Sequence, residues 1–521
     1  MLGGPQRGVL SLSRSRTRAH AMLTAARYQS TQSKAERFVQ PIDPASLPRG
    51  YLVASTYAGV KKAISPAPAT SSAPSAPAPK PDVSLIVSSR PAAVAGVFTT
   101  NVFQAAPVVH ATEALRASRT TADGREGPRT TAILANSGCA NAVTGREGLE
   151  DTKELVGLVR TELTPAAKKR PAGDSDVLML STGVIGVRLP VGAIKRAVQH
   201  LVHGQVLQSN ADAWLDVARA YMTTDTFPKL RTRTFTLGNR ECRMAGIDKG
   251  AGMIHPHMAS PAGLHATLLG VLLTDAPIAP SALQQCLDEA VRVSFNCISV
   301  DGDMSTNDTI LALANGQAPE LPNGAQPIPA GTEITAATHP REFAVFREEL
   351  TALCLELAHL IVRDGEGAEK FVQVRVRGAS DYAQAHAIAS SISTSALVKC
   401  AMHGEDANWG RILCAAGYAR RPASDWAIDP RKVNVTFVPP AGASDAQPIQ
   451  TLVNGTPQAV DEVAAAALLA HEDICIDVDL QGGTWDPARA GAEAVYWTCD
   501  FSKEYITVRG LLTQINGDYR T

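Results

Sequence analysis

The sequence lacks the features that mark several classes of protein. Aromatic residues make up only 5% of its 521 residues, and the formal net charge is −1. That balance provides no overall field to attract nucleic acid or an anionic membrane surface. The nine cysteines are scattered and include no Cys-x-x-Cys pair. This spacing excludes a disulfide scaffold and the usual structural zinc sites, and it favours a reducing compartment.

An uninterrupted membrane-spanning run is also missing. Residues 250–274 carry no Asp, Glu, Lys or Arg, and this length would be enough to cross a bilayer. Pro256 and Pro261 interrupt the stretch, and lipid would leave backbone groups near them unpaired. We therefore expect a buried segment or part of an active site, with no membrane span.

The near-neutral total hides a basic amino-terminal segment. Residues 1–40 hold seven Lys and Arg and one Glu, which leaves 42 basic and 49 acidic side chains in the rest of the chain. A start that is rich in Arg and Ser and poor in acids is typical of a mitochondrial transit peptide, predicted here over residues 1–30. It would direct the protein to the mitochondrial matrix. The alternative is a disordered basic tail with no targeting role.

Mixed strand and helix patterns predict an α/β protein of the layered α+β type, with sheets enclosed by helices. Apolar, β-branched runs predict strands at 84–89, 131–136, 177–183, 266–275, 371–378, 433–439 and 474–480. Apolar residues spaced three and four apart predict helices near 151–166, 191–208, 210–222, 281–295, 342–363, 382–399, 408–418 and 459–470. Residues 65–81 contain six prolines among small residues and are expected to form a disordered insertion.

Several common signatures of function are missing. The sequence contains no GxxxxGK[ST], HExxH or GxSxG motif. Residues 250–255 begin like a dinucleotide-binding fingerprint, but His255 stands where the third glycine is needed. Residues 301–308 resemble the start of a calcium loop, yet Thr306 and Ala312 replace the glycine and glutamate that such a loop requires.

Small polar residues beside glycines are the remaining candidates. Thr182 and Gly183 follow an apolar run, and a glycine there lets two successive N–H groups converge on one oxygen, as an oxyanion hole requires. An ordinary strand-ending turn would have the same sequence. Thr223 in turn either binds a substrate or simply ends the helix before it. Lys249, just before Gly250, either holds a carboxylate or is solvated.

Thr267 has two readings as well. It is either the first residue of a buried strand or a nucleophile. Cleavage of the Ala266–Thr267 bond would make Thr267 a new amino terminus, whose α-amine, with an unperturbed pKa near ~8, would serve as general base for its own hydroxyl. The residues alone leave both readings open.

Nine blocks of the sequence carry a resemblance that decides between these readings. They are residues 90–108, 135–145, 180–186, 222–229, 249–256, 265–277, 294–309, 403–411 and 515–521. In this order they resemble the ornithine acetyltransferase family, the self-cleaving, bifunctional glutamate N-acetyltransferases of arginine biosynthesis. The resemblance extends from about residue 50 to the carboxyl terminus, apart from the insertions.

The resemblance implies a role for each matching residue. Thr267 matches the threonine that attacks the preceding peptide bond, at Ala266, and later carries the acetyl group. Thr182 and Gly183 match the oxyanion-hole pair. The substrate-binding positions of the family match Thr223, Lys249, Thr267, Glu405, Asn516 and Thr521. Glu405 also precedes a predicted helix, so capping of that helix is its alternative role.

The resemblance further implies the reaction and the assembly. Acetyl passes from N-acetylornithine through an acetyl-threonine to glutamate, and acetyl-CoA is a possible second donor. Neither a metal nor a tightly bound cofactor is required. The implied fold is the DmpA-like layered fold with an N-terminal threonine nucleophile. Self-cleavage would give an α chain (31–266) and a β chain (267–521), assembled as a heterotetramer of two α and two β chains.

The chain departs from the family pattern at one place. The family runs from HPxMA directly into TLLG, whereas seven residues, 260–266, separate the two halves here. Ser260 keeps the upstream register and Thr267 keeps the downstream one. We favour Thr267 because the apolar run behind it is intact. Two other functions stay open: a self-processed aminopeptidase or amidase, and a non-enzymatic matrix protein on the same scaffold.

Overall fold

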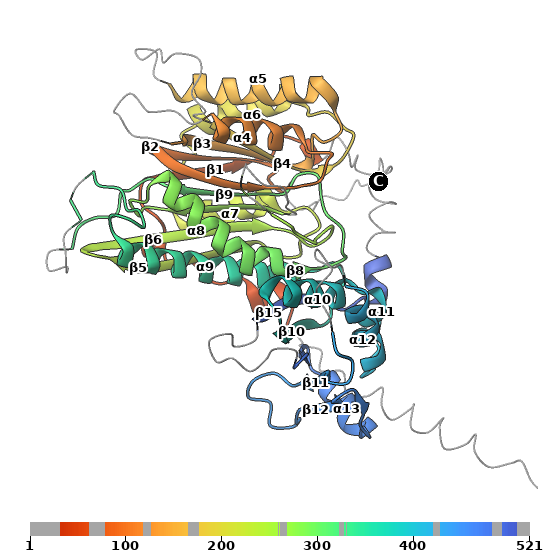
Figure 1. The fold of residues 1–521 in the computed structure, drawn as a ribbon. Coiled ribbons are helices and arrows are strands. Elements are labelled where there is room, and N and C mark those ends of the chain that lie inside the picture. The colour runs from red at the N-terminus through yellow and green to blue at the C-terminus, as the bar shows by residue number, and fades with distance from the viewer. Residues whose placement is uncertain are drawn as a thin grey trace, which may run out of the picture.

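Two β-sheets with helices packed against them form the protein (Figure 1). The computed structural model describes residues 32–61, 79–117, 127–164, 177–258, 260, 268–321, 328–329, 331–419, 428–481 and 492–507. The expected α/β class with layered sheets and helices is confirmed. The proposed transit peptide, residues 1–30, and residues 65–78 of the proline-rich insertion lie outside the described residues.

The first sheet has eight strands in the order β4-β3-β2-β9-β7-β6-β5, with β1 paired to β2. The strands are β1 (Tyr51–Thr56), β2 (Val83–Phe98), β3 (Arg129–Cys139), β4 (Val177–Val184), β5 (Lys229–Leu237), β6 (Arg240–Lys249), β7 (Leu269–Thr274) and β9 (Thr309–Ala314). β7 runs parallel to β9 and antiparallel to β6, and β9 runs antiparallel to β2. β7 and β9 therefore lie between β2 and β6, two strands that come earlier in the chain.

Alternating apolar residues give the first sheet two buried faces. In β4, Val177 and Met179 pack under α5 (Gly145–Leu163) and α6 (Val191–His203). Leu178 and Leu180 pack on the other side with α4 (Ala106–Arg116) and α7 (Ala211–Tyr221). Successive side chains of a strand point to opposite faces, so this pattern requires helices on both sides of the sheet. Figure 1 shows α5 and α6 at the top of the molecule.

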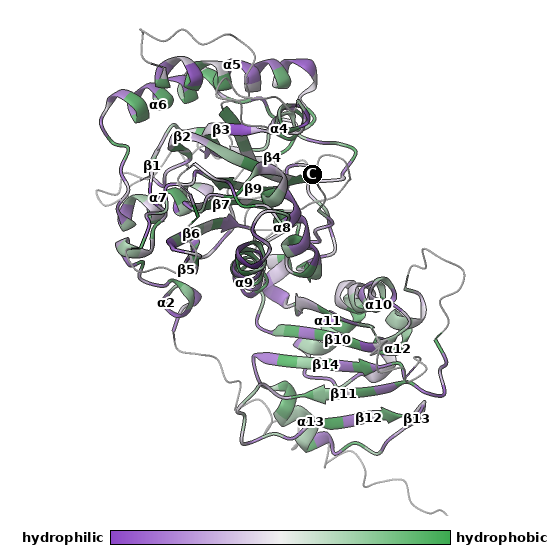
Figure 2. Cartoon of the chain, turned by 60° about the vertical axis from the view of Figure 1, so that its left-hand side comes forward, coloured by the Kyte–Doolittle hydropathy of each residue, from purple (hydrophilic) through white to green (hydrophobic). Residues whose placement is uncertain are grey.

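The second sheet has seven strands in the order β13-β12-β11-β14-β10-β15-β8. The strands are β8 (Ile298–Ser299), β10 (Phe371–Ala379), β11 (Asn434–Val438), β12 (Ile449–Val453), β13 (Thr456–Pro457), β14 (Asp473–Asp479) and β15 (Ala492–Cys499). Its helices are α10 (Tyr382–Thr394), α11 (Ala396–His403), α12 (Trp409–Gly417) and α13 (Glu462–Leu469). Figure 2 shows β10, β14, β11 and β12 side by side in this part of the molecule.

One continuous core joins the two sheets. It runs from Val97 of β2 through α8 (Pro280–Val293) and α9 (Pro340–Arg363) to Val374 of β10 and Tyr496 of β15. The short helices α2 (Lys34–Phe38), η2 (Pro44–Ser46) and η3 (Phe295–Cys297) complete the described elements. No helix in the described part of the chain is long and apolar enough to cross a membrane.

All seven expected strands and all eight expected helices overlap observed elements. One expectation is wrong in detail: residues 382–399 do not form a single helix. The chain is extended at Ser395, with φ −67° and ψ 113°, and the Ser395 side chain accepts a hydrogen bond from the Val398 N–H to begin α11. A serine that caps a new helix in this way divides what the apolar spacing alone presents as continuous.

Candidate active site

Thr182 and Gly183 lie at the carboxyl end of β4, where its parallel pairing with β3 becomes irregular. Gly183 has φ +129°, and a Cβ atom on it would lie only 2.3 Å from the carbonyl carbon of Gly138. Only glycine allows this backbone conformation and this close approach of two strands. Gly183 is therefore a position that requires glycine, and Thr182 beside it is 8% exposed.

Lys249 reaches the same place from the end of β6. It is 8% exposed, and its Nζ donates to Thr182 Oγ1 at 3.3 Å. The alternative interpretation of Lys249 as a solvated side chain is therefore wrong. Lys249 pairs with Leu269, the first residue of β7, and the Leu268 carbonyl accepts from the Thr309 N–H at 2.6 Å. The described chain therefore resumes after residue 267 at the same end of the sheet as Lys249.

Thr223 lies in the loop after α7, which ends one residue before Met222. The Thr223 residue is exposed, and its N–H donates to Asp225 Oδ2 at 3.0 Å. Asp225 Oδ1 accepts from the Gly250 N–H at 2.7 Å. Through this one carboxylate the Thr223 loop is attached to the turn that follows Lys249. The structure thus brings together Thr182, Gly183, Thr223 and Lys249.

Glu405 lies elsewhere, between α11 and α12. Its carboxylate forms an ion pair with Lys370 at 3.1 Å, and Lys370 Nζ also donates to the carbonyls of Leu469, Ala470 and His471. Glu405 does not cap α12, because Asn408 accepts the hydrogen bond at that helix end. Among the described residues, no hydrogen bond or ion pair joins Glu405 to the Thr182–Lys249 group.

Four of the predicted site residues fall in parts of the chain that the structure does not describe. Ala266, Thr267, Asn516 and Thr521 lie outside the described residues. Their roles stay predictions, and Leu268 marks where the described chain continues behind Thr267.

The sequence reading missed two buried carboxyl groups beside this site. Asp248 and Asp308 are 1% and 3% exposed, and each has one carboxylate oxygen without a hydrogen-bond partner. Burial raises the pKa of Asp308 well above its ordinary value, although the Lys249 ammonium acts in the opposite direction. Asn307 donates to the carbonyl of Ser181 at 2.8 Å and so attaches this segment to β4. The only feature of the sequence that could have indicated Asp308 is the cluster of polar residues at 305–309.

Replacing Asp308 by Asn is expected to change how stability depends on pH. The pKa of Asp308 is higher in the folded protein than in the unfolded chain, where it is ~3.9, so this residue lowers the free energy of unfolding as pH rises. The advantage of the variant over the parent should therefore grow between pH 5 and 7, by up to about 1.4 kcal/mol per pH unit. Urea titrations at both values would measure it.

Replacing the exposed Asp212 on α7 by Asn is the control for the loss of one carboxylate from the surface. A pH-independent difference for D308N would contradict a protonated Asp308.

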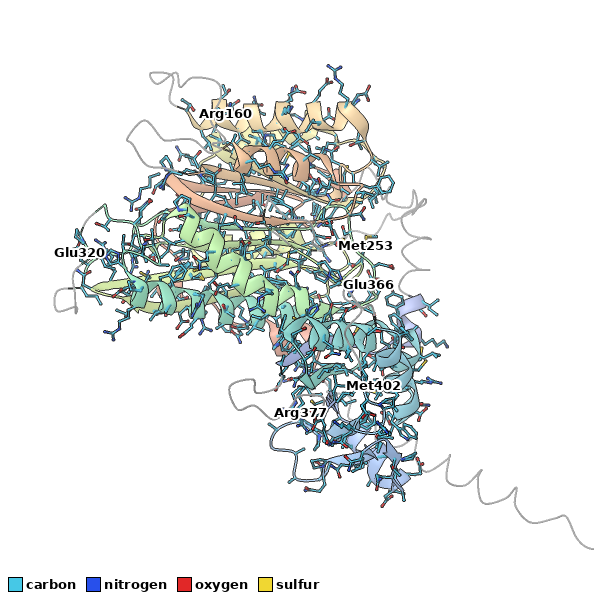
Figure 3. All side chains as sticks on the ribbon, viewed as in Figure 1. Arg160, Met253, Glu320, Glu366, Arg377 and Met402 are labelled. Carbon is cyan, nitrogen blue, oxygen red and sulfur yellow. The ribbon has the colours of Figure 1, made fainter. Side chains whose placement is uncertain are left out.

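Residues 301–308, which resemble the start of a calcium loop, have a structural role. The Asp301 carboxylate accepts from the Met253 N–H at 2.6 Å and from the Ile254 N–H at 2.9 Å. It therefore fixes the segment that follows Lys249. This segment also touches the turn after α9, where the Glu366 N–H donates to the Ala251 carbonyl at 2.8 Å. Figure 3 shows Met253 and Glu366 close together at this junction of the two sheets.

A histidine and two carboxylates form the one group in the described chain with metal-ligand spacing: Glu369, His403 and Asp500. His403 Nδ1 lies 2.8 Å from one Asp500 oxygen, and the other oxygen accepts from the N–H groups of Glu369 and Lys370. Both oxygens of Asp500 are thus used within the protein. We assign this group a structural role.

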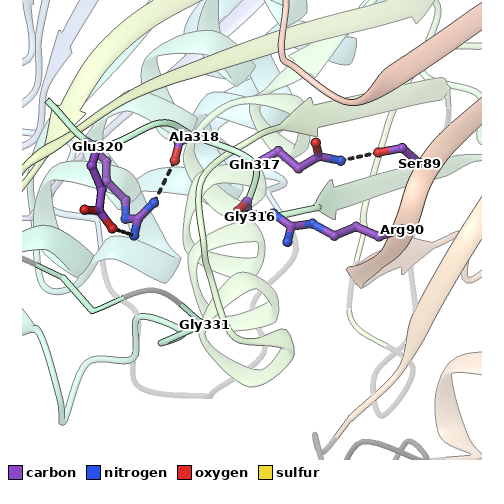
Figure 4. A pocket seen from close by; sticks show the side chains of 8 residues that line it. Ser89, Arg90, Gly316, Gln317, Ala318, Glu320 and Gly331 are labelled. Carbon is purple, nitrogen blue, oxygen red and sulfur yellow. Dashed lines mark hydrogen bonds and ion pairs between the residues drawn. The ribbon is translucent and has the colours of Figure 1, made fainter.

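A surface hollow of about 660 Å³ lies at the opposite end of the first sheet (Figure 4). It is lined in part by Arg240, the first residue of β6, and by Gly316, which follows β9. Arg240 is bound to Glu320 and to the Ala318 carbonyl, and Arg90 to the Gly316 carbonyl. Its polar groups therefore bind one another, and the hollow is separate from the Thr182–Lys249 group.

Comparison with known proteins identifies the family. The ArgJ family model matches residues 70–521. The mitochondrial "arginine biosynthesis bifunctional protein ArgJ" of Malassezia globosa is 63% identical over 502 residues, which cover 92% of this chain and 97% of that protein. The chain belongs to the ArgJ family. A protein of the same name from Cryptococcus neoformans is 48% identical and covers 95% of this chain and 94% of its own.

The family assignment confirms the resemblance to ornithine acetyltransferases. This ArgJ-family chain is a mitochondrial acyltransferase, a bifunctional enzyme of arginine biosynthesis. Among solved structures, the ArgJ protein of Bacillus halodurans is 32% identical, with a TM-score of 0.38 over 45% of this chain and 95% of that one.

Proposed function

We propose that this enzyme transfers acetyl from N-acetylornithine to glutamate through an acetyl group on Thr267, in the mitochondrial matrix. The observation that carries the proposal is the meeting of Thr182, Gly183 and Lys249 at the sheet end where the chain resumes after Thr267. A buried ammonium beside a threonine hydroxyl and a glycine turn is suited to bind a carboxylate and to stabilise an oxyanion.

The first reaction in the proposal is self-cleavage. The Thr267 hydroxyl attacks the Ala266 carbonyl, the C–N bond breaks, and the released nitrogen takes the hydroxyl proton. Water then hydrolyses the ester and frees the α chain (31–266) from the β chain (267–521). The new α-amine of Thr267 is afterwards available as a general base.

The second reaction is acetyl transfer in two steps. Thr267 Oγ gives its proton to the α-amine and attacks the acetyl carbonyl, while Thr182 and Gly183 stabilise the oxyanion. Ornithine leaves with the proton, and the amine of glutamate then attacks the threonine ester. The C–O bond of the ester breaks, and a proton from the glutamate amine returns to the Thr267 hydroxyl through the α-amine. Lys249 binds the α-carboxylate that both amino acids share, and Thr223 contributes from its exposed loop.

The remaining substrate-binding roles are proposed for Glu405, Asn516 and Thr521. The bifunctional enzyme also accepts acetyl-CoA as donor and thereby makes N-acetylglutamate from glutamate directly. We propose no metal or resident cofactor for either reaction. The processed enzyme is proposed to assemble as two α and two β chains.

Intact-mass measurement with amino-terminal sequencing tests the proposal. A fragment that begins Thr-Leu-Leu-Gly is expected, and one that begins Ser-Pro-Ala would move the nucleophile to Ser260. Incubation with N-acetylornithine and glutamate should give ornithine and N-acetylglutamate in equal amounts. Release of free acetate without N-acetylglutamate would instead show a hydrolase, and acetyl-CoA with glutamate tests the second donor.

A further inference from the structure

Asp225 is a buried carboxylate that the proposed reaction does not use. Its side chain is 0% exposed. One oxygen accepts from Lys229 Nζ and from the Gly250 N–H, each at 2.7 Å, and the other accepts from the Thr223 N–H at 3.0 Å. The three donors come from the loop after α7, the start of β5 and the turn after β6, so one carboxylate bridges these three segments.

Two of these segments carry proposed substrate-binding residues. Thr223 supplies one of the N–H groups itself, and Gly250 directly follows Lys249. Hydrogen bonds to an ionised acceptor are about twice as strong as those between neutral groups. Lys249 is also fixed by its pairing with Leu269 in the sheet, whereas Thr223 is exposed.

The surroundings keep Asp225 ionised. Burial alone would raise the pKa of Asp225, but the Lys229 and Lys249 ammonium groups outweigh burial and hold it below its ordinary value. Lys229 is itself buried between two carboxylates, with Asp225 at 2.7 Å and Asp364 at 2.6 Å. An uncompensated charge here would be costly, so these three groups depend on one another.

We propose that Asp225 is a positioning residue of the substrate site, which holds Thr223 against the Lys249–Gly250 turn so that both meet the substrate together. This inference rests on the proposed function, in which Thr223 and Lys249 bind the amino-acid substrate. Asp225 does not touch the substrate. It acts through the backbone of the two residues beside it.

Asp364 offers a matched comparison within the same ion group. It binds the same Lys229 ammonium with 0% of its side chain exposed. Its other hydrogen bonds go to the N–H and hydroxyl of Thr226, and none of them reaches Thr223 or Gly250. A purely structural role of the buried ion group would make the two carboxylates equivalent. A positioning role makes only Asp225 important for substrate binding.

The test compares Asp225→Asn with Asp364→Asn in the full chain. In Asp225 and in Asp364, both carboxylate oxygens accept hydrogen bonds, so the amide NH₂ of either asparagine variant must face a hydrogen-bond donor. The two variants should therefore lose similar thermal stability. We expect D225N to raise the KM for N-acetylornithine at least about tenfold, and D364N less than about threefold. Equal effects on KM in the two variants would overturn the proposal.

A second pair protects the test against loss of folding. Asp225→Glu and Asp364→Glu keep the charge that faces Lys229 but move the carboxylate by one methylene group. D225E should still raise KM more than D364E does, and the reverse order or equality would again overturn the proposal. A parent enzyme without acetyl transfer would contradict the proposed function, whereas active variants with equal KM would contradict only the positioning role.

Discussion

The Thr267→Ala variant is expected to remain a single uncut chain and to lose acetyl transfer. Alanine removes the hydroxyl that would attack the Ala266 carbonyl, so no new amino terminus forms and no acetyl group is carried. Loss of a nucleophile typically lowers the rate by at least about 10⁴-fold. Denaturing electrophoresis would show the uncut chain, and the production of N-acetylglutamate would measure the activity.

The Ser260→Ala variant is the matched control, since Ser260 is the competing hydroxyl seven residues upstream. It should be cleaved and active like the parent. A second control, Thr267→Ser, keeps a hydroxyl at the position and should still be cleaved. Normal processing of T267A together with an uncut S260A would transfer the nucleophile to Ser260 and keep the rest of the proposed chemistry.

The Gly183→Ala variant is expected to lose both stability and activity. The added Cβ would lie 2.3 Å from the Gly138 carbonyl carbon and 2.6 Å from the Cys139 nitrogen, so β3 and β4 must separate at this point. Together with the φ of +129°, the clash should lower the free energy of unfolding by about 3 kcal/mol or more. A displaced oxyanion-hole donor lowers kcat by about 10²–10³-fold.

Gly186 provides the control for backbone strain alone. Its φ is +81°, and a Cβ atom there would meet nothing within 4 Å. Gly186→Ala should therefore lower the free energy of unfolding by only about 1 kcal/mol and leave acetyl transfer in place. Thermal midpoints and kcat of the two variants would be compared. Equal losses in both would show that the contact of Gly183 with β3 has no special role.

The sequence predicted strands well where apolar residues run together, and poorly where they do not. β5 was missed because it carries charged side chains: Arg231 and Arg233 bind Glu356 and Glu349 of α9 at 2.6 and 2.7 Å. The ion pairs that stabilise β5 as a strand involve a helix more than 100 residues away in the chain. No local pattern carries that information.

β2 shows a second limit. The apolar pattern predicted a strand over 84–89, but β2 continues to Phe98 through Pro91. Proline cannot donate to a ladder and normally ends a strand. Here the register with β3 shifts between Val87 and Ala92, so the irregularity absorbs the proline and the strand continues.

The candidate site also contains residues that the sequence predicted and residues that it did not. Thr182, Gly183, Thr223 and Lys249 were candidates from the sequence itself, and a resemblance to known sequences implied their roles. The structure brings these four together. Asp225 and Asp308 were not predicted as site residues, because their importance comes from burial and from partners such as Lys229 and Lys249. The role of a buried charge is a property of the packed fold and leaves little trace in the sequence.

The strand order of the first sheet has a consequence for the two-fragment enzyme. β7 and β9 would belong to the β chain, yet they lie between β2 and β6 of the α chain and bond to both. Two fragments joined in this way can separate only if two rows of backbone hydrogen bonds break at once. Once denatured, they would have to find each other again, so recovery of the native protein becomes a second-order process that slows on dilution. The cleaved protein would therefore refold less readily than an uncut chain, but its assembled state would persist for a long time because it separates slowly.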